Sequence, residues 1–390
     1  MNITPSYPEG WRVVRFGDVV TSLNRTTRDP VVDGLDRIVG LDHMDSESLP
    51  LLRWDLLADL PDGTSFTRTF RAGQVLFGKR RAYQRKVSVP EFDGVCSGDI
   101  LVFEVYSAEI LQEFLPYVVQ SHGFFDHALG TSAGSLSPRT KWSELMKYEF
   151  ALPPFEVQQY VVAILSSVDG VLAGYTTVID ACSRLRRALV REAVSTSRES
   201  LPLEEFGTVV RGARFPEELA TREARDLAFL KVADLPGSGG FERIKVSSHY
   251  ISEADAMSLG LFPLPPGSIL FQRVGAALRS DRKRVLAIPA IVDENLLACV
   301  PSGDVNADAL FAVLEQVSLL PWIQDGTVPS INERALRQVP VPLLRSDVAD
   351  HLATCLLALE MLCDSASAAR ESLKAARLSM FEAISSGGQG

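Results

Sequence analysis

Two long stretches of the chain carry apolar residues at alternating steps of four and three. In the first stretch they stand at positions 157, 161, 164, 168, 171, 175, 178, 182, 185 and 189, with no proline between Pro154 and Pro202. In the second they stand at 348, 352, 355, 359, 362, 366, 369, 373, 376, 380 and 383. This spacing is typical of helices that pair in a coiled coil. We therefore predict long helices over 155–198 and 344–386, each about 55 to 60 Å long.

The regions before these helices have a different pattern. Short apolar runs at 74–77, 99–104, 268–271 and 290–292 alternate with Gly, Pro and Asp, which is typical of strands separated by turns. The segment Ala108 to His122 is predicted to be helical. Proline-rich segments at 152–154 and 339–342 end the two regions. The pattern predicts two domains, 1–154 and 199–343, and a tail over 387–390.

The two halves of the chain repeat one another. Phe16-Gly17 near the start returns as Phe206-Gly207, and the first ten positions of the second apolar series repeat the first series at a constant offset of 191 residues. A repeat of about half the chain indicates a duplicated domain, not a solenoid. We expect an α+β fold in which two duplicated α/β domains are separated and followed by long helices that form an antiparallel coiled coil. Two independent amphipathic helices, each packed on its own domain, are the alternative.

Small residues occupy the middle of both predicted helices. Antiparallel pairing would bring Gly170 and Gly174 opposite Ala366 and Ala369. A glycine inside a helix costs about 1 kcal/mol relative to alanine. We interpret these residues as a place of close backbone approach or as a docking surface for a partner, with a merely weak point in the helix as the alternative.

Composition narrows the class of protein. The 390 residues carry a net charge of −10, which argues against a broadly basic nucleic-acid binder but not against local basic patches. Five cysteines without a Cys-x-x-Cys pair indicate a reduced, cytoplasmic protein. The first residues do not resemble a signal peptide, and no stretch reaches 18 apolar residues, so we expect no membrane span.

Motifs for catalysis are incomplete. Gly73 to Arg80 resembles a phosphate-binding loop, but Arg80 replaces the Ser or Thr that would hold Mg²⁺. In Leu152-Pro153-Pro154-Phe155, a leucine replaces the Asn or Asp of the amino-methyltransferase motif. Asp281-Arg282-Lys283 has the D-x-K of a metal-dependent nuclease without a Pro-Asp upstream, and the five histidines form no evident triad or zinc cluster. We predict no catalytic residues, no metal and no cofactor bound by this chain.

Basic clusters follow the strand-like runs at corresponding places of the two halves. The first comprises Lys79, Arg80, Arg81, Tyr83, Gln84, Arg85 and Lys86, and the second comprises Arg273, Arg279, Arg282, Lys283 and Arg284. A second pair of segments, 130–142 and 326–332, supplies Ser135, Ser137, Arg139, Lys141, Ser330 and Asn332. Arg and Gln read base edges in the major groove, whereas Lys, Ser and backbone amides bind phosphates. We predict that these residues bind DNA; solvated loops and structural turns are the alternatives.

Taken together, these segments resemble the specificity subunit of Type I restriction-modification systems. The resemblance covers essentially the whole chain and depends on the order of its parts: Trp11 to Val20, the Gly-x-Val-Leu-Phe-Gly run at 73–78, residues 92–100, the segment 130–142, and Leu152 to Gln159, which is similar to the family's Pro-Leu-Pro-Pro-x-x-Glu-Gln. The second half departs from this pattern, because 342–347 lacks the Glu-Gln pair and the second basic loop is longer.

The resemblance implies a non-catalytic reader of a two-part sequence in double-stranded DNA. It implies two partner methyltransferase subunits that bind S-adenosylmethionine, and often a restriction subunit that uses ATP and Mg²⁺. An acidic anti-restriction decoy, or a stand-alone recognition module that binds a methyltransferase, is the alternative. The basic clusters argue against a decoy, since a DNA mimic would carry carboxylates there.

Overall fold

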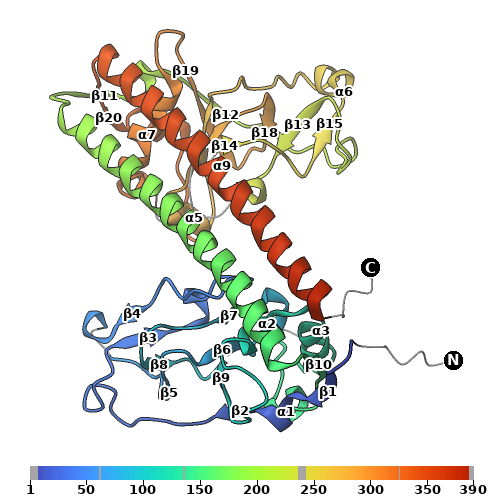
Figure 1. Cartoon of the computed structure of the whole chain (residues 1–390). Helices are drawn as coiled ribbons and strands as arrows, with labels where there is room; N and C mark the ends of the chain where they lie inside the picture. Colours follow the sequence, from blue (N-terminus) through green and yellow to red (C-terminus); the bar gives the residue numbers. More distant parts are fainter. Residues whose placement is uncertain (1–7, 61–62, 135–136, 236–242, 325, 386–390) are drawn as a thin grey trace. The chain divides into compact units, whose positions relative to one another are not determined.

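The chain has a mixed α/β fold that divides into two compact units. The computed structural model describes residues 8–60, 63–134, 137–235, 243–324 and 326–385 (Figure 1). Unit 1 comprises Met1–Val178 and Ala366–Gly390, and unit 2 comprises Ile179–Ser365. Each long helix is therefore shared between the two units.

Unit 1 contains two main sheets and a short two-stranded one. Its strands are β1 (Arg12–Arg15), β2 (Val20–Leu23), β3 (Arg37–Val39), β4 (Asp55–Leu56), β5 (Arg68–Phe70), β6 (Val75–Gly78), β7 (Val87–Ser88), β8 (Gly94–Cys96), β9 (Ile100–Val105) and β10 (Glu149–Leu152). The sheets have the orders β2-β9-β6-β7, β4-β3-β8-β5 and β1-β10. The predicted apolar runs at 74–77 and 99–104 thus correspond to the central strands β6 and β9.

Aromatic side chains fill the core of unit 1 between the first sheet and its helices. These helices are α1 (Phe16–Val19), α2 (Leu115–Gln120), α3 (His122–Gly130) and α4 (Trp142–Leu145). Phe77 and Phe103 stack with ring centroids 5.7 Å apart, and Phe124 meets Phe77 edge-on. The predicted helix over 108–122 is wrong in its bounds, because α2 begins only at Leu115 and ends before Ser121, whose side chain caps α3.

Unit 2 has a similar set of sheets, with one more strand in the first sheet and one fewer in the second. Its strands are β11 (Ser200–Pro202), β12 (Gly207–Arg211), β13 (Leu227–Leu230), β14 (Arg243–Ile244), β15 (Tyr250–Ile251), β16 (Ile269–Gln272), β17 (Lys283–Leu286), β18 (Ala290–Val292), β19 (Leu296–Pro301) and β20 (Pro340–Pro342), and its helices are α6 (Glu253–Ser258), α7 (Ala307–Gln316) and α8 (Glu333–Arg337). The orders are β12-β19-β16-β17-β14, β15-β13-β18 and β11-β20. In both units the middle sheet contains a parallel pair, β3 with β8 and β13 with β18.

The two long helices are α5 (Phe155–Ser195) and α9 (Ser346–Ser385), drawn green and red in Figure 1. The apolar positions named by the sequence differ from the buried ones over much of each helix. Val171, Val178, Leu185, Leu362 and Met380 are exposed, and the buried positions lie one residue further on at several of these sites. Polar residues explain the difference: Gln158, Asp169, Glu360, Lys374 and Arg377 belong to the buried faces and are invisible to an apolar pattern.

A buried ion pair joins α5 to α9 within unit 1. The Arg377 guanidinium contacts the Asp169 carboxylate and the side-chain oxygen of Gln120, and the Tyr117 hydroxyl donates to Asp169 at 2.9 Å. Burial raises the pKa of Asp169 and, in the same network, that of Tyr117. Because both charges are removed from water, either one alone would be strongly unfavourable.

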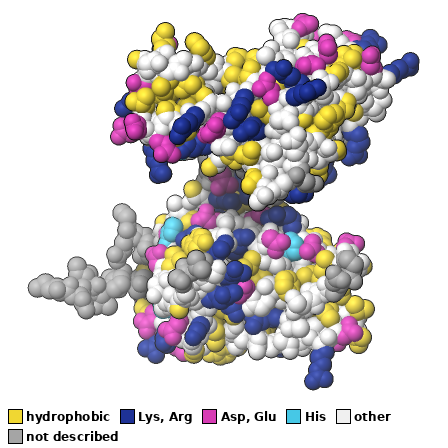
Figure 2. Space-filling view, turned by 180° about the vertical axis from the view of Figure 1, so that it is seen from behind, with side chains coloured by type: hydrophobic (Ala, Val, Ile, Leu, Met, Phe, Trp, Pro, Cys, Tyr) yellow, Lys and Arg dark blue, Asp and Glu magenta, His cyan; other side chains and the backbone are white. Residues whose placement is uncertain are grey.

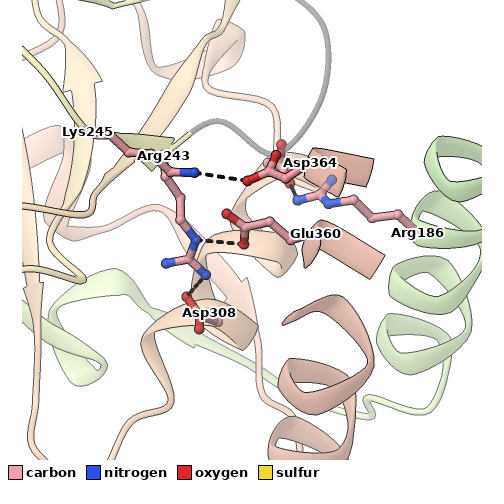
Figure 3. Close-up of polar contacts among 7 residues, drawn as sticks. Arg186, Arg243, Lys245, Asp308, Glu360 and Asp364 are labelled. Carbon is pink, nitrogen blue, oxygen red and sulfur yellow. Dashed lines mark hydrogen bonds and ion pairs between the residues drawn. The ribbon is translucent and has the colours of Figure 1, made fainter. Parts of the chain in front are cut away.

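In unit 2, α9 instead contributes acidic residues, which pair with basic residues of the domain (Figure 3). The Arg243 guanidinium donates to Glu360 and to Asp308, each at 2.7 Å, and the Lys245 ammonium lies 3.0 Å from Asp364. Arg186 of α5 pairs with Glu315 of α7. Apolar contacts accompany these pairs, since Val190 and Ala193 of α5 share a cluster with Leu352 and Leu356 of α9.

By length and composition alone, α5 and α9 could each cross a membrane, but a core helix of a soluble protein passes the same test. Few residues of their most apolar windows are buried, 17% in α5 and 33% in α9, so both helices present apolar side chains that the described chain does not cover.

The five cysteines are free thiols. Burial raises the pKa of Cys96 and of Cys299 to about 12.

We predict that Arg377→Met destabilises unit 1 by about 3 to 5 kcal/mol, because Asp169 is left as a buried charge without its partner. Urea unfolding followed by tryptophan fluorescence measures the effect. Arg370→Met is the matched control on the same helix, since Arg370 pairs with its neighbour Glu371 at 3.9 Å, a distance too long for a hydrogen bond. Equal stability losses for the two variants would contradict the assigned role of Arg377.

Candidate nucleic-acid interface

In unit 1 the two segments singled out from the sequence lie against each other. The Arg81 amide donates to the Pro138 carbonyl at 2.8 Å, and the Thr140 amide donates to the Lys79 carbonyl at 3.0 Å. Arg80 donates to the Ser137 hydroxyl at 3.2 Å. The basic loop that follows β6 is therefore fastened to the Gly- and Ser-rich segment before α4.

The same backbone arrangement recurs in unit 2. There the Gly275 amide donates to the Pro329 carbonyl at 3.0 Å, and the Ile331 amide donates to the Arg273 carbonyl at 2.9 Å. A β-bridge joins Val274 to Ser330, as one joins Arg80 to Arg139 in unit 1. Each unit thus presents a loop after its central strand, β6 or β16, fixed by the chain segment that precedes a short helix, α4 or α8.

Asp99 organises the first of these arrangements electrostatically. Its carboxylate accepts from Arg139 at 2.8 and 3.2 Å and lies 3.6 Å from Arg80. The hydrogen bond from Arg139, opposed by burial and aided by the neighbouring positive charges, lowers the pKa of Asp99. Burial and the positive charge of Arg68 lower the pKa of Lys79. One carboxylate thus keeps several cations close together.

The turn at the tip of the first loop is tightly constrained. Arg81 has φ of 55° and Arg85 has φ of 49°, a left-handed conformation that side-chain-bearing residues rarely adopt, and a short 3₁₀ turn, η3 (Ala82–Gln84), lies between them. Ala82 is buried beneath the turn, whereas Tyr83 is 56% exposed and Arg81 is exposed. Arg81, Tyr83 and the half-buried Gln84 are therefore available to a ligand.

Arg85 and Lys86 do not belong to this exposed set, which corrects their prediction as free DNA-binding side chains. The Arg85 guanidinium pairs with Glu47 at 2.9 Å, donates to the Gln120 carbonyl and lies over the Phe125 ring. The Lys86 ammonium donates to the Leu41 carbonyl, and burial lowers its pKa. Both side chains are half-buried and engaged in contacts within unit 1.

Lys283 and Arg284 are likewise misassigned by the sequence. They lie in strand β17 with exposed fractions of only 3% and 4%. Lys283 pairs with Asp281 at 2.8 Å, and Arg284 donates to the Lys283 carbonyl at 2.6 Å. A charged run in the sequence looked like a loop, but strand pairing with β16 places it in the interior.

The remaining predicted residues divide into exposed and structural ones. Arg139, Lys141, Arg279, Arg282 and Asn332 are exposed, and Arg273 is half-buried and donates to the Glu294 carbonyl. Asn332 also caps α8, since its side-chain oxygen accepts from the Ala335 amide. Ser137 and Ser330 are half-buried. Ser135 lies outside the described residues.

Lys and Arg side chains gather on the face of unit 1 seen in Figure 2, with a few acidic groups among them.

Unit 2 contains a cavity of about 940 Å³ that the sequence did not predict. Its lining includes Arg214, Phe215, Lys231 and Asn295. The Lys231 ammonium lies 3.3 Å from the centre of the Phe215 ring. The Asn295 carbonyl accepts from the Arg273 amide, so this cavity borders the second basic loop. No short motif marks it, because its residues come from four separate segments.

Comparisons with known proteins agree with this arrangement. No family model matches the chain. Over 159 residues the sequence is 26% identical to the Type I restriction enzyme EcoDI specificity subunit of Escherichia coli, a match that covers 40% of this chain and about a third, 34%, of that protein. The crystal structure of the Type I restriction-modification system S subunit from M. genitalium shares 12% identity, covers 98% of this chain and 97% of its own, and has a TM-score of 0.58.

This chain resembles a Type I specificity subunit in sequence and has the fold of one. Two further structures cover nearly all of both chains: the HsdS subunit from Thermoanaerobacter tengcongensis, with 20% identity and a TM-score of 0.40, and a structure titled for complex assembly and conformational transition of the type I R-M system, with 19% identity and a TM-score of 0.49.

The small residues in the middle of the helices of this specificity-subunit-like chain do not mark a close internal approach. A Cβ atom built on Gly170 or on Gly174 meets no other atom within 4 Å. Ala366 is buried and Ala369 is half-buried. The first explanation offered for the two glycines is therefore wrong, and a docking surface stays a prediction.

The residues of the D-x-K motif serve the fold of unit 2. One Asp281 oxygen pairs with Lys283 and the other accepts from the Leu319 amide at 3.0 Å. Among the residues that the structure describes, no three His, Cys, Asp or Glu side chains are grouped so that they could hold a metal ion.

The lowered pKa of Asp99 gives a prediction with a definite sign. A carboxyl group whose pKa is depressed by folding stabilises the native state above its unfolded pKa of about 4, and this contribution is lost as the pH falls through the folded value. Asp99→Asn should therefore lower the unfolding free energy at pH 7 by less than about 1 kcal/mol, since Arg139 is exposed to solvent. Urea unfolding at pH 7 and pH 3 should show this difference shrink at the lower pH. Glu91→Gln, at an exposed position of the same domain, is the control; an Asp99 effect that grows on acidification would contradict the assignment.

Proposed function

We propose that this chain is the DNA-recognition subunit of a Type I restriction-modification complex and that each unit reads one half of a two-part target. The observation that carries the proposal is the recurrence of the same fastened basic loop in both units, at Arg81 and Pro138 and at Gly275 and Pro329. The sequence likeness to a specificity subunit supports it. On this proposal the recognition domains are 1–154 and 199–343, joined by the helical segments 155–198 and 344–386.

The exposed residues of the loops suit DNA chemically. In unit 1, Arg81 and Gln84 provide donors of the kind that read guanine and adenine edges, and Lys141 suits a phosphate. In unit 2, Arg279 and Arg282 have the corresponding role. These surface cations also favour a DNA reader over an acidic decoy, which would carry carboxylates at the same places. We expect the chain itself to be non-catalytic and to work in the cytoplasm, where chromosomal DNA is accessible.

The helices suit a spacer and a docking element. In unit 1, Asp169 of α5 meets Arg377 of α9, and in unit 2, Val190 of α5 shares a cluster with Leu352 of α9. Residue numbers thus rise along one helix and fall along the other, which supports an antiparallel coiled coil. Val171, Val178 and Leu185 recur every seven residues on α5 and are exposed, as are Leu357 and Met361 on α9. We propose that methyltransferase subunits cover these apolar residues.

Two such subunits would supply S-adenosylmethionine and the methyl-transfer chemistry. A restriction subunit, where present, would supply ATP- and Mg²⁺-dependent cleavage. The recognition chain would contribute only the selection of the target sequence on the DNA.

Co-expression with the cognate methyltransferase subunits, followed by methylome sequencing, tests the proposal. We expect co-purification and methylation at one two-part motif. Inserting four residues into both helices, after Ala173 and after Ala366, should lengthen the gap between the half-sites, because each added residue extends a helix by about 1.5 Å. The half-sequences themselves should not change. Unchanged spacing in an insertion variant that still assembles would refute the spacer role, and absence of any motif in the wild type would refute the function.

Adjacent residues of unit 2 provide a second test. Arg282→Ala should reduce the dependence of log K on log salt concentration by about one unit, because the exposed guanidinium can neutralise a phosphate. Lys283→Ala should leave that slope unchanged and instead lower the melting temperature, because Lys283 is buried against Asp281. Fluorescence anisotropy over a range of salt concentrations measures the slope. The opposite pattern would show that unit 2 presents a different surface to DNA.

A further inference from the structure

Glu47 contacts both the exposed turn of the first basic loop and helix α9. Four non-glycine residues in the described chain have left-handed φ, and three of them lie together in unit 1: Glu47, Arg81 and Arg85. Such conformations persist only where the surrounding contacts fix them, and they gather at sites where geometry matters for function.

Glu47 holds the turn on one side. Its carboxylate lies 2.9 Å from the Arg85 Nε, and its backbone amide donates to the Arg85 carbonyl at 3.1 Å. The Arg85 guanidinium is mostly buried; it donates to the Gln120 carbonyl at 2.9 Å and lies 4.5 Å from the centre of the Phe125 ring. Arg85 ends the turn, so the contacts of its guanidinium hold one end of the segment that carries the exposed Tyr83 and Arg81.

The other side of Glu47 contacts α9. The Glu47 carbonyl accepts from Arg377 at 3.1 Å, and the neighbouring Ser46 carbonyl accepts from the Lys374 ammonium at 3.2 Å. A cavity of about 360 Å³ lies beside these groups and is lined by residues that include Glu47, Arg85, Gln120 and Arg377. A guanidinium released from Glu47 would therefore have space into which it could move.

We propose that Glu47 is a positioning residue for sequence recognition. Acting through Arg85, it sets the geometry of the turn that carries Arg81 and Tyr83. Its contact with Arg377 couples that geometry to the position of α9. The inference rests on the proposed function, because the turn is taken to read DNA. Without the carboxylate, the Arg85 charge lacks its anionic partner in a poorly hydrated place and moves toward water, and the turn moves with it.

Unit 2 fastens the corresponding turn differently. The turn η6 (Ala276–Ser280) ends at Asp281, which has φ of 51° and takes the place of Arg85. Asp281 is held by Lys283 and by the Leu319 amide, and no residue of α9 is among these anchors. A change at Glu47 should therefore alter recognition of one half-site only.

The test uses the full chain assembled with its methyltransferase subunits. A random-sequence duplex library is selected for binding with the wild type, Glu47→Gln, Arg85→Gln, the double variant and the control Glu91→Gln, an exposed carboxylate of the same domain. Affinity is then measured for the selected motif, for duplexes altered in one half-site, and for a duplex without the motif.

For Glu47→Gln we expect discrimination at one half-site to fall about tenfold, comparable with the loss of a bidentate base contact. Discrimination at the other half-site and affinity for the motif-free duplex should stay within about twofold, which shows that the protein is folded. The double variant should resemble Arg85→Gln alone, because Glu47 acts through Arg85, and Glu47→Asp should recover part of the discrimination.

Two outcomes overturn the inference. One is unchanged discrimination in Glu47→Gln; the other is a loss that affects both half-sites and motif-free DNA equally, which would indicate a merely structural residue. If the wild type selects no motif, the proposed function fails instead, so the two failures are distinguishable.

Discussion

The structure depends on charges buried against helix α9. In unit 1 this helix contributes the cations Lys374 and Arg377, and the latter meets Asp169 in the interior. In unit 2 it contributes the buried Glu360, which meets Arg243, and the exposed Asp364, which meets Lys245. Removing one partner of such a buried pair leaves an uncompensated charge, which costs about 3 to 5 kcal/mol. The charged contacts of α9 therefore complement its apolar packing in each unit.

The positive charges of the basic loops serve two different purposes, although the residues look alike in the sequence. Some of them form contacts within the fold, with carboxylates or carbonyl groups as partners: Arg85, Lys86, Lys283 and Arg284. Arg81, Lys141 and Arg282 are exposed and can meet a polyanion. Because the inward cations fix the loop, the outward ones are presented in a defined position, and the entropy cost of ordering them at binding is reduced.

Corresponding positions in the two units use different chemistry for the same backbone geometry. Arg85 in unit 1 and Asp281 in unit 2 both end the exposed turn in a left-handed conformation, yet one is held by a carboxylate and the other by an ammonium group. The tip residue also changes, from Tyr83 to Arg279. If the proposed function holds, such different tips on a similar backbone would suit two half-sites of different sequence.

The sequence by itself determined the long helices, the strands β6, β9, β16 and β18, and the location of both basic loops, because periodicity and composition are local properties of the chain. Helix α5 begins at the predicted residue, Phe155. Only the tertiary structure decided which residues of those elements face inward. The buried faces of the helices include Asp169 and Arg377, which no apolar pattern can count, and the burial of Lys283 follows from its strand pairing with Phe271. Whether a charge is a ligand-binding group or part of the core depends on partners far away in the sequence, and that information is absent from any local pattern.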